Sequence, residues 1–187
     1  RKAGHEDRAL MFCSLSKVTF PGAGVAAMAA SRRNIDYILK NMFPMIISFD
    51  KLNQVRHIRF LKDMDGLAAH MEKHRALLEP KFRAVLAILD EGLSGCGSIA
   101  RWTKPNGGYF LSLYTLGGCA KRTVQLCREA GVVLTDAGAA YPYGVAPQDS
   151  NIRIAPTFPP LDELETASRL LCVCVRIATL EKLLQRQ

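Results

Sequence analysis

Three residues near the start of the chain have types and spacing suited to covalent catalysis: Ser14, Ser16 and Lys17. Ser14 is the last residue of a short apolar run over residues 9–14, and Ser16 and Lys17 follow that run. Such a run is typical of a strand buried on both faces. A lysine desolvated beside such a strand loses its proton more readily, and its neutral amine can form a Schiff base with an aldehyde. The serine hydroxyls can donate hydrogen bonds to a phosphate on the same ligand. Two plainer interpretations stay open, in which Lys17 is an exposed loop lysine and the serines cap a turn.

A second candidate lies far along the chain, on the alternating segment Asn151–Ala155. Alternate residues of a strand share a face, so Asn151, Arg153 and Ala155 are expected to point the same way. The planar guanidinium of Arg153 offers two parallel donors, which match the two oxygens of a carboxylate. The alternative is a structural ion pair with an acidic neighbour.

Other patterns that carry chemistry are weaker. Gly22, Gly24 and Ala27 fit the Gly-x-Gly-x-x-Ala dinucleotide fingerprint, but small apolar residues follow where a helix should begin. His70 and His74 would share one helical face with no third ligand nearby, which favours an exposed face over a metal site. The six cysteines form no Cys-x-x-Cys pair and are interpreted as buried free thiols. We therefore expect no metal.

The composition of the 187 residues is that of a protein with a packed core. Hydrophobic residues make up 49% of the chain, and charge or glycine interrupts every apolar run well before the roughly 20 residues of a membrane span. The formal charge of +8 permits binding of anions such as phosphate esters or carboxylates. Because the basic residues are scattered without interleaved aromatic residues, neither nucleic acid nor a membrane is an expected partner. The N-terminal residues show no signal-peptide pattern, and we expect a cytoplasmic protein in which this chain begins within a fold.

Hydrophobic periodicity, with glycine and proline signals, predicts the elements that would position these residues. Apolar residues at helical spacing run over residues 50–93, where Pro80 predicts a kink or a break near Glu79 because it lacks an N–H. A final helix follows Pro160, with acidic residues in its first turn at the positive end of the helix dipole. The other predicted elements are strands over 9–14, 25–30, 109–114, 132–134 and 151–155, a helix over 34–42, and a helix over 120–130 that Gly131 terminates.

One continuous run resembles a known family. The cofactor-lysine loop of fold-type I aminotransferases, which depend on pyridoxal 5′-phosphate (PLP), is similar to Ser14-Leu15-Ser16-Lys17-Val18-Thr19-Phe20-Pro21-Gly22-Ala23-Gly24-Val25. Within that class the run resembles the aspartate aminotransferase subgroup called MocR-like. The resemblance extends over essentially the whole chain and includes residues 37–53, 104–110, 141–144 and 150–156.

The resemblance implies a role for each candidate residue. Lys17 would be the Schiff-base lysine and would move the proton at the substrate Cα. Ser14, with Ser16, would contact the cofactor phosphate, and Arg153 would bind the substrate α-carboxylate. The cofactor would be PLP, and the reaction would convert aspartate and 2-oxoglutarate into oxaloacetate and glutamate. A homodimer is implied for the intact protein.

The resemblance also implies an α/β fold that forms the C-terminal part of such an enzyme. Residues 1–48 would end the large PLP-binding domain, whose sheet is mostly parallel. Residues 49–93 would be the long connecting helices, and residues 94–187 would form a small C-terminal α/β domain.

Two departures limit what these residues can do by themselves. Many relatives carry an arginine shortly after the lysine to neutralise the phosphate, where this chain has Gly24 and Val25. In family members the acid that pairs with the pyridine nitrogen comes from sequence preceding the position of Arg1, and PLP chemistry needs that acid. Residues 1–187 alone are therefore expected to be inactive. The alternative function is an aminotransferase-like effector domain of a transcription regulator, which a winged-helix segment upstream would favour.

Overall fold

The computed structural model describes residues 4–46 and 48–185 of the chain. They fall into two compact units, Arg1–Arg75 and Ala76–Gln187, and the boundary lies inside one long helix, α3 (Met64–Leu93). The sequence suggested three segments instead, and that finer division stays a prediction. None of the helices in the described ranges is long and apolar enough to cross a membrane.

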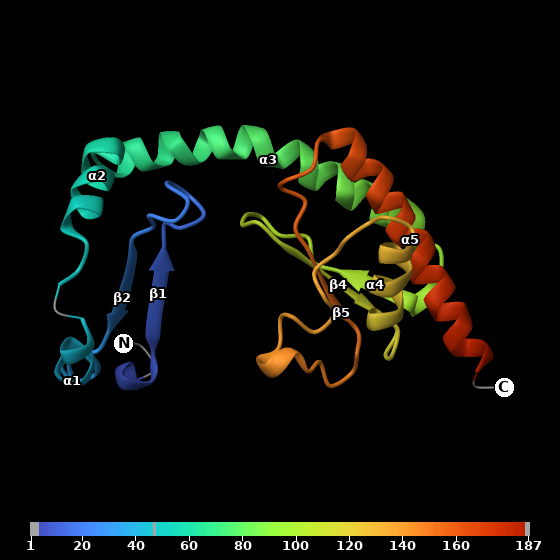
Figure 1. The fold of residues 1–187 in the computed structure, drawn as a ribbon, viewed down its shortest axis with the longest axis horizontal. Coiled ribbons are helices and arrows are strands. Elements are labelled where there is room, and N and C mark those ends of the chain that lie inside the picture. The colour runs from blue at the N-terminus through green and yellow to red at the C-terminus, as the bar shows by residue number, and fades with distance from the viewer. Residues whose placement is uncertain (1–3, 47, 186–187) are drawn as a thin grey trace. The chain divides into compact units, whose positions relative to one another are not determined.

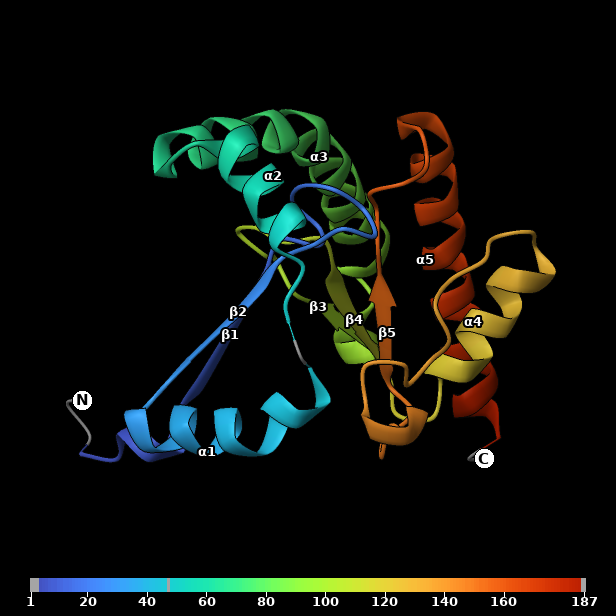
Figure 2. The ribbon, with the colours of Figure 1, turned by 60° about the vertical axis from the view of Figure 1, so that its left-hand side comes forward.

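The first unit contains a two-stranded ribbon formed by β1 (Leu10–Ser14) and β2 (Ala26–Ala30), which lie side by side in Figures 1 and 2. The strands are antiparallel, and β1 begins opposite the end of β2. Two strands joined by a short loop return antiparallel, whereas parallel pairing needs a longer crossover connection. All strand pairs in the described residues are antiparallel. Two strands do not test the mostly parallel sheet expected for the whole large domain, which stays a prediction.

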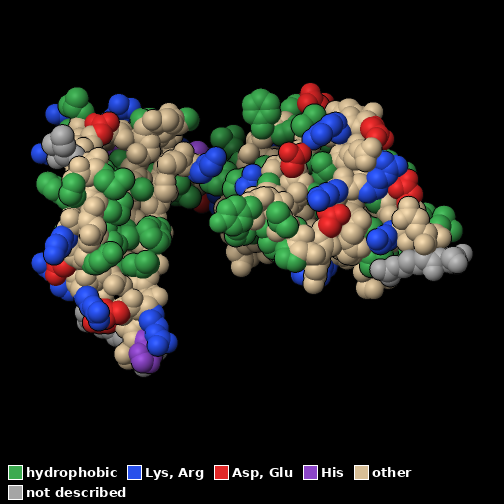
Figure 3. Space-filling model, turned by 60° about the horizontal axis from the view of Figure 1, so that its bottom comes forward, with side chains coloured by type: hydrophobic (Ala, Val, Ile, Leu, Met, Phe, Trp, Pro, Cys, Tyr) green, Lys and Arg blue, Asp and Glu red, His purple; other side chains and the backbone are tan. Residues whose placement is uncertain are grey.

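The strand β1 is exposed along its whole length, which corrects the predicted burial on both faces. Phe12 is 73% exposed and Met11 is 65% exposed, because β2 is the only strand that pairs with β1 among the described residues. Figure 3 shows hydrophobic side chains gathered on the visible face of this unit. The apolar composition of β1 therefore marks surface that the described residues leave uncovered.

Helices of the first unit begin at polar caps. The helix α1 (Arg32–Met42) follows Ser31, whose hydroxyl accepts a hydrogen bond from the Asn34 N–H at 3.3 Å, and this helix was predicted from the sequence. The helix α2 (Lys51–Leu61) follows Asp50, whose carboxylate accepts from the Asn53 N–H at 2.9 Å. Two short 3₁₀ helices complete the unit, η1 (Glu6–Arg8) and η2 (Phe43–Met45).

The predicted long helical segment is interrupted at Lys62 and not at Pro80. Lys62 has φ +65° and ψ −63°, and the Asp63 N–H donates to the Leu61 carbonyl at 2.8 Å, which makes a γ-turn. Asp63 then caps α3 by accepting the Gly66 N–H at 2.8 Å. A side chain at Gly66 would collide with the Leu61 carbonyl, so the glycine permits this tight junction. The helix α3 continues through Pro80.

The second unit is a three-stranded antiparallel sheet covered by helices (Figure 1). Its strands are β3 (Ala100–Trp102), β4 (Leu111–Thr115) and β5 (Asn151–Ile154), in that spatial order. Apolar residues on one face of the sheet pack with the end of α3, with α4 (Ala120–Glu129) and with α5 (Leu161–Leu184). This core includes Val85, Leu89, Leu93, Leu111, Leu113, Val124, Ile152, Ile154, Leu171 and Val175. Two short 3₁₀ helices are η3 (Gly97–Ile99) and η4 (Pro142–Gly144).

The end of α4 confirms one prediction and corrects another. Gly131 has φ +89° and donates its N–H to the Arg128 carbonyl at 3.0 Å, while the Val132 N–H donates to the Cys127 carbonyl at 2.8 Å. This pair of bonds is a Schellman motif, which a glycine favours. The predicted strand over residues 132–134 is wrong, because no strand forms there. The third strand of the sheet is β3, which the sequence did not predict.

Candidate active site

Lys17 lies in the loop over residues 15–25 that joins β1 to β2, called the Lys17 loop below. Ser14 ends β1, so the three residues that the sequence singled out in this region are brought together on one connection. All three side chains are exposed. The desolvated lysine expected from the sequence is therefore not found within the described residues, and an exposed loop lysine describes this part of the chain better.

Backbone hydrogen bonds define the turn around Lys17. The Val18 and Thr19 N–H groups both donate to the Leu15 carbonyl, at 2.9 and 3.0 Å. The Leu15 N–H donates to the Val25 carbonyl at 2.8 Å, which closes the loop at its base. The path of the backbone on both sides of Lys17 is thus fixed by local bonds.

The two serine hydroxyls lie against each other. Ser14 Oγ and Ser16 Oγ are 2.8 Å apart, and the Ser16 N–H donates to Ser14 Oγ at 3.1 Å. The second bond is the turn-capping role that the sequence left open. It uses an acceptor site of Ser14, and the bond between the two hydroxyls uses one of their hydrogens, so one hydroxyl donor of the pair is left for a bound phosphate.

Gly24 lies against Ser16, and a side chain at this position would crowd that residue. A Cβ built on Gly24 would lie 2.9 Å from Ser16 Cα and 3.0 Å from Ser16 Cβ, and it would overlap Ser16 Oγ. The buried side-chain amide of Asn53 on α2 donates to the Ala23 carbonyl at 2.7 Å and holds this arm of the loop. The strand β2 follows the loop, so the glycines do not begin a helix as a dinucleotide fingerprint requires.

Three histidines contact the Lys17 loop, which the sequence did not predict. His70 and His74 on α3 place their Nε2 atoms 2.7 and 2.9 Å from the Val18 carbonyl oxygen. His57 on α2 places its Nε2 2.7 Å from Thr19 Oγ1. The expected exposed histidine face is wrong, because His70 and His74 are half-buried and His57 is buried. No group of three or more His, Cys, Asp or Glu side chains in the described residues is arranged to hold a metal ion.

Arg153 lies on β5 in the second unit, opposite Ser112 of β4. Its Cζ lies 4.8 Å from the centroid of the Phe110 ring, a cation–π distance. Its Nε is buried and has no hydrogen-bond partner among the described residues. None of the ion pairs between described side chains includes Arg153, so the structural ion pair is not supported here. The guanidinium therefore keeps donor capacity for an oxygen ligand.

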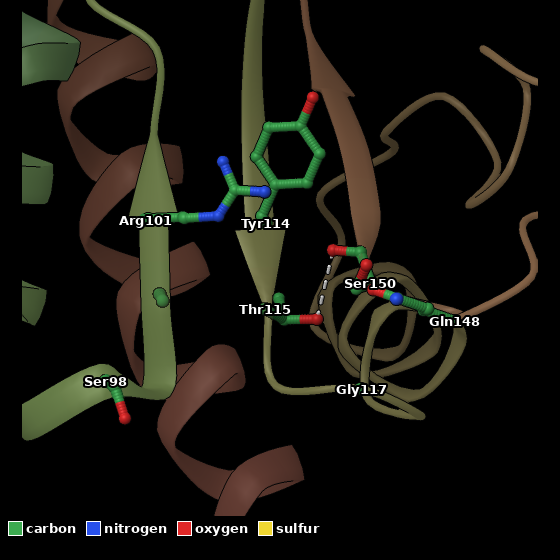
Figure 4. A pocket seen from close by; sticks show the side chains of 8 residues that line it. Ser98, Arg101, Tyr114, Thr115, Gly117, Gln148 and Ser150 are labelled. Carbon is green, nitrogen blue, oxygen red and sulfur yellow. Dashed lines mark hydrogen bonds between the residues drawn. The ribbon is translucent and has the colours of Figure 1, made fainter.

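A second arginine lies on the same face of the sheet. Arg101 pairs with Tyr114 across β3 and β4, and its Cζ lies 4.0 Å from the centroid of the Tyr114 ring. Figure 4 shows this stacked pair beside Thr115 and Ser150, in a pocket that also reaches Ser98, Gly117 and Gln148. The predicted site residues do not line this pocket, and it carries no part of the argument for the active site.

The cysteines are mainly buried thiols in the second unit, as the sequence suggested. Cys119, Cys127, Cys172 and Cys174 are buried, whereas Cys13 is exposed on β1. Burial, with a smaller contribution from the neighbouring Cys174, raises the pKa of Cys127 to about 12. Burial also raises the pKa of Cys172 to about 11, although nearby arginines oppose the shift. These thiols stay protonated at neutral pH and belong to the core.

Comparison with known proteins identifies relatives along the whole chain. The family profile described as aspartate amino-transferase matches residues 1–187. A protein of Mycolicibacterium smegmatis, named as a candidate aminotransferase, is 49% identical over 97% of this chain and 42% of its own length. An aspartate aminotransferase of Corynebacterium glutamicum is 42% identical over 96% of this chain and 41% of its own length.

The fold is shared with solved structures. The crystal structure of an aspartate transaminase from Corynebacterium glutamicum matches with a TM-score of 0.89 and 42% sequence identity, and the match covers 97% of this chain and 42% of that chain. The present chain therefore spans less than half the length of the curated relatives it matches. The family match over all 187 residues and the shared fold show that this chain belongs to the aspartate aminotransferase family.

Proposed function

We propose that the protein containing these residues is a PLP-dependent aminotransferase that converts aspartate and 2-oxoglutarate into oxaloacetate and glutamate. The observation that carries the proposal is the Lys17 loop, where a lysine stands beside a pair of serine hydroxyls in a chain of this family. The Corynebacterium glutamicum relative named aspartate aminotransferase supports the choice of donor. The MocR-like subgroup, the C-terminal placement and the homodimer belong to the same proposal and rest on the resemblance, and the cytoplasmic location is proposed with them.

The residues of the loop fit the cofactor. PLP supplies an aldehyde that condenses with an amine and a ring that withdraws electrons from the substrate. Ser14 and Ser16 hydrogen-bond each other at 2.8 Å, so one hydroxyl hydrogen is free to donate to a phosphate oxygen, and the second would donate to the phosphate once it turns from its partner. The missing side chain at Gly24 lets the loop close against Ser16 and keeps that pair together. Phosphate binding in this loop would thus depend on hydroxyl and backbone donors.

Each candidate side chain has one task in the proposed reaction. The amine of Lys17 would hold the cofactor, and would then accept the proton that leaves the substrate Cα and deliver it to the cofactor C4′ carbon. Arg153 binds the substrate α-carboxylate, for which its unpartnered buried Nε and planar guanidinium are suited. Phe110 packs against the guanidinium and limits its movement.

Borohydride reduction of the intact protein, followed by peptide mapping, tests the role of Lys17. A pyridoxyl group on the peptide that contains Lys17 is expected, and Lys17→Arg, which keeps the charge, is expected to abolish both the label and transamination. A label on another lysine would overturn the assignment.

The substrate is tested separately. Steady-state rates with aspartate, alanine and aromatic amino acids as donors should favour aspartate, and preference for another donor would overturn that part of the proposal. Residues 1–187 expressed alone should show no transaminase activity, because the acid for the pyridine nitrogen is expected elsewhere in the protein.

A further inference from the structure

The Lys17 loop is attached to α3 by an unusual pair of hydrogen bonds. His70 Nε2 and His74 Nε2 lie 2.7 and 2.9 Å from the carbonyl oxygen of Val18, the residue that follows Lys17. A carbonyl oxygen only accepts, so both Nε2 atoms carry a hydrogen and donate it to the same oxygen. The two Nε2 atoms lie 3.1 Å apart, within hydrogen-bond distance of each other, and both bonds to Val18 need each ring to carry a hydrogen on Nε2. Residues four apart on a helix share a face, which is how both rings reach one carbonyl.

A second bond secures the next residue of the loop. His57 Nδ1 lies 2.8 Å from the Asn53 carbonyl, so Nδ1 carries the hydrogen and, in the neutral ring, Nε2 accepts from the Thr19 hydroxyl at 2.7 Å. Phe20 packs its ring 5.2 Å from His57 and 5.1 Å from Phe60, measured between ring centroids. Among the described residues of the first unit, only Asn53 and His57 are buried. Both buried residues of this unit therefore bind the Lys17 loop.

These contacts leave the backbone after Lys17 little freedom. The Val18 and Thr19 N–H groups are bonded to the Leu15 carbonyl, and the Val18 carbonyl is bonded to His70 and His74. Rotation of the peptide between Val18 and Thr19 would break bonds on both of its sides. The side chain of Lys17 is long and flexible, so these bonds can fix only its backbone, from which the side chain starts.

We propose that His70 and His74 are positioning residues for Lys17, whose backbone they fix by donating two N–H groups to the Val18 carbonyl. This inference rests on the proposed function of Lys17 and names two residues through which that function is maintained. A metal site is the competing interpretation of a histidine pair four residues apart. It is not favoured, since both Nε2 atoms are used as donors and the described residues offer no third ligand among His, Cys, Asp and Glu.

Two kinds of substitution in the intact protein separate the N–H donor from the ring. Phenylalanine at both positions keeps an aromatic ring, including the edge contact of His70 with Phe60 at 5.1 Å, but removes both donors. Glutamine loses the ring and keeps an N–H at similar reach. His5→Phe is the matched control, because His5 is exposed and lies outside the loop.

The readouts are hydrogen exchange of the cofactor-free protein and steady-state kinetics of the loaded enzyme. In the double phenylalanine variant, amides of residues 15–25 should exchange about tenfold faster, equivalent to about 1.4 kcal/mol. The kcat should fall by about tenfold, while KM for the amino acid stays within about twofold. The double glutamine variant should recover most of both losses, and His5→Phe should match the wild type. If the double variant does not fold, His74→Phe alone should show about a threefold effect.

Several results would overturn the inference. Unchanged exchange in the phenylalanine variants would show that the histidines do not hold the loop. Failure of glutamine to recover kcat would show that the ring, and not the N–H donor, matters. Borohydride labelling of the wild type separates this inference from the proposed function. If the label is on Lys17 but exchange and kcat of the phenylalanine variants are unchanged, only the positioning role of His70 and His74 is overturned. If the label is on another lysine, the proposed function of Lys17 is overturned, and the positioning role falls with it.

Discussion

The close approach of Gly24 to Ser16 makes a sharp prediction for Gly24→Ala. The new Cβ would lie 2.9 Å from Ser16 Cα, inside the distance that real Cβ atoms keep from other heavy atoms. The backbone of Ser16 cannot easily retreat. Its own N–H is bonded to Ser14 Oγ at 3.1 Å, and the Leu15 N–H is bonded to the Val25 carbonyl at 2.8 Å. The loop must therefore open at its base to admit one methyl group.

The expected cost follows from two opposing effects. Overpacking of a closed site costs about 1–3 kcal/mol. Replacing glycine by alanine also reduces the entropy of the unfolded chain, which returns about 0.4–1 kcal/mol. We expect Gly24→Ala to lower the free energy of unfolding by about 1–2 kcal/mol. Gly95→Ala is the control, because no atom lies within 4 Å of its Cβ position, and it should be neutral or slightly stabilising.

Denaturant unfolding of the intact protein measures the change, and a titration with PLP reports on the loop itself. PLP affinity should fall in Gly24→Ala, since displacement of Ser16 separates the serine pair. Adding Ser16→Ala removes the overlap with Oγ but leaves the new methyl group crowded against the Ser16 backbone, so the double variant should recover only part of the stability. Equal stability of Gly24→Ala and Gly95→Ala would refute the close approach.

Three further predictions concern the second unit and β1. Arg153→Lys should raise KM for the amino acid about tenfold with little change in stability, because an ammonium cannot bond a carboxylate in the bidentate manner; steady-state kinetics checks this. Gly131→Ala should lower the free energy of unfolding by about 1 kcal/mol in a denaturant titration, because φ is +89° there. The raised pKa values of Cys127 and Cys172 mean that the folded protein keeps protons that the unfolded chain releases above about pH 8.5. Stability should therefore fall as pH rises from there toward about 11 and 12, and mass spectrometry after alkylation at neutral pH should find Cys13 modified and these two thiols protected.

Elements governed by local signals were predictable from the sequence. The end of α4 at Gly131 and the start of α5 after Pro160 match the structure, because the bonds that decide them join residues a few positions apart. The clustering of Ser14 and Ser16 with Lys17 was also predictable, since one connection carries all three. The position of Arg153 on a strand followed from its alternating neighbours.

Features governed by distant contacts were not predictable. One local feature was also missed: the helical segment breaks at Lys62, where Asp63 caps α3 and Gly66 leaves room for the Leu61 carbonyl, whereas α3 continues through Pro80. The apolar run of β1 indicated burial, yet a strand is buried only where other elements cover it. The apolar residues 132–134 predicted a strand, and nothing in their pattern indicated that they would be irregular.

The histidine pair shows why the same spacing supports opposite interpretations. His70 and His74 are as compatible with a metal site or an exposed face as with a loop anchor, and their spacing fixes only that both rings point the same way. The deciding atom is the Val18 carbonyl, which lies more than 50 positions earlier in the sequence. No local pattern can reveal such a partner.

The absence of a side chain at Gly24 and the contact between Ser14 and Ser16 depend on each other. An arginine at position 24 would add a cation for a phosphate, but its Cβ would also push Ser16 away from Ser14. A loop that keeps the glycine closes tightly and concentrates its donors in two hydroxyls and the turn backbone. In the proposed function, the phosphate would then be held by neutral hydrogen bonds whose strength depends on loop geometry more than on charge. That dependence gives His70 and His74 their importance, because a loop without an arginine for the phosphate has to keep its other donors in place.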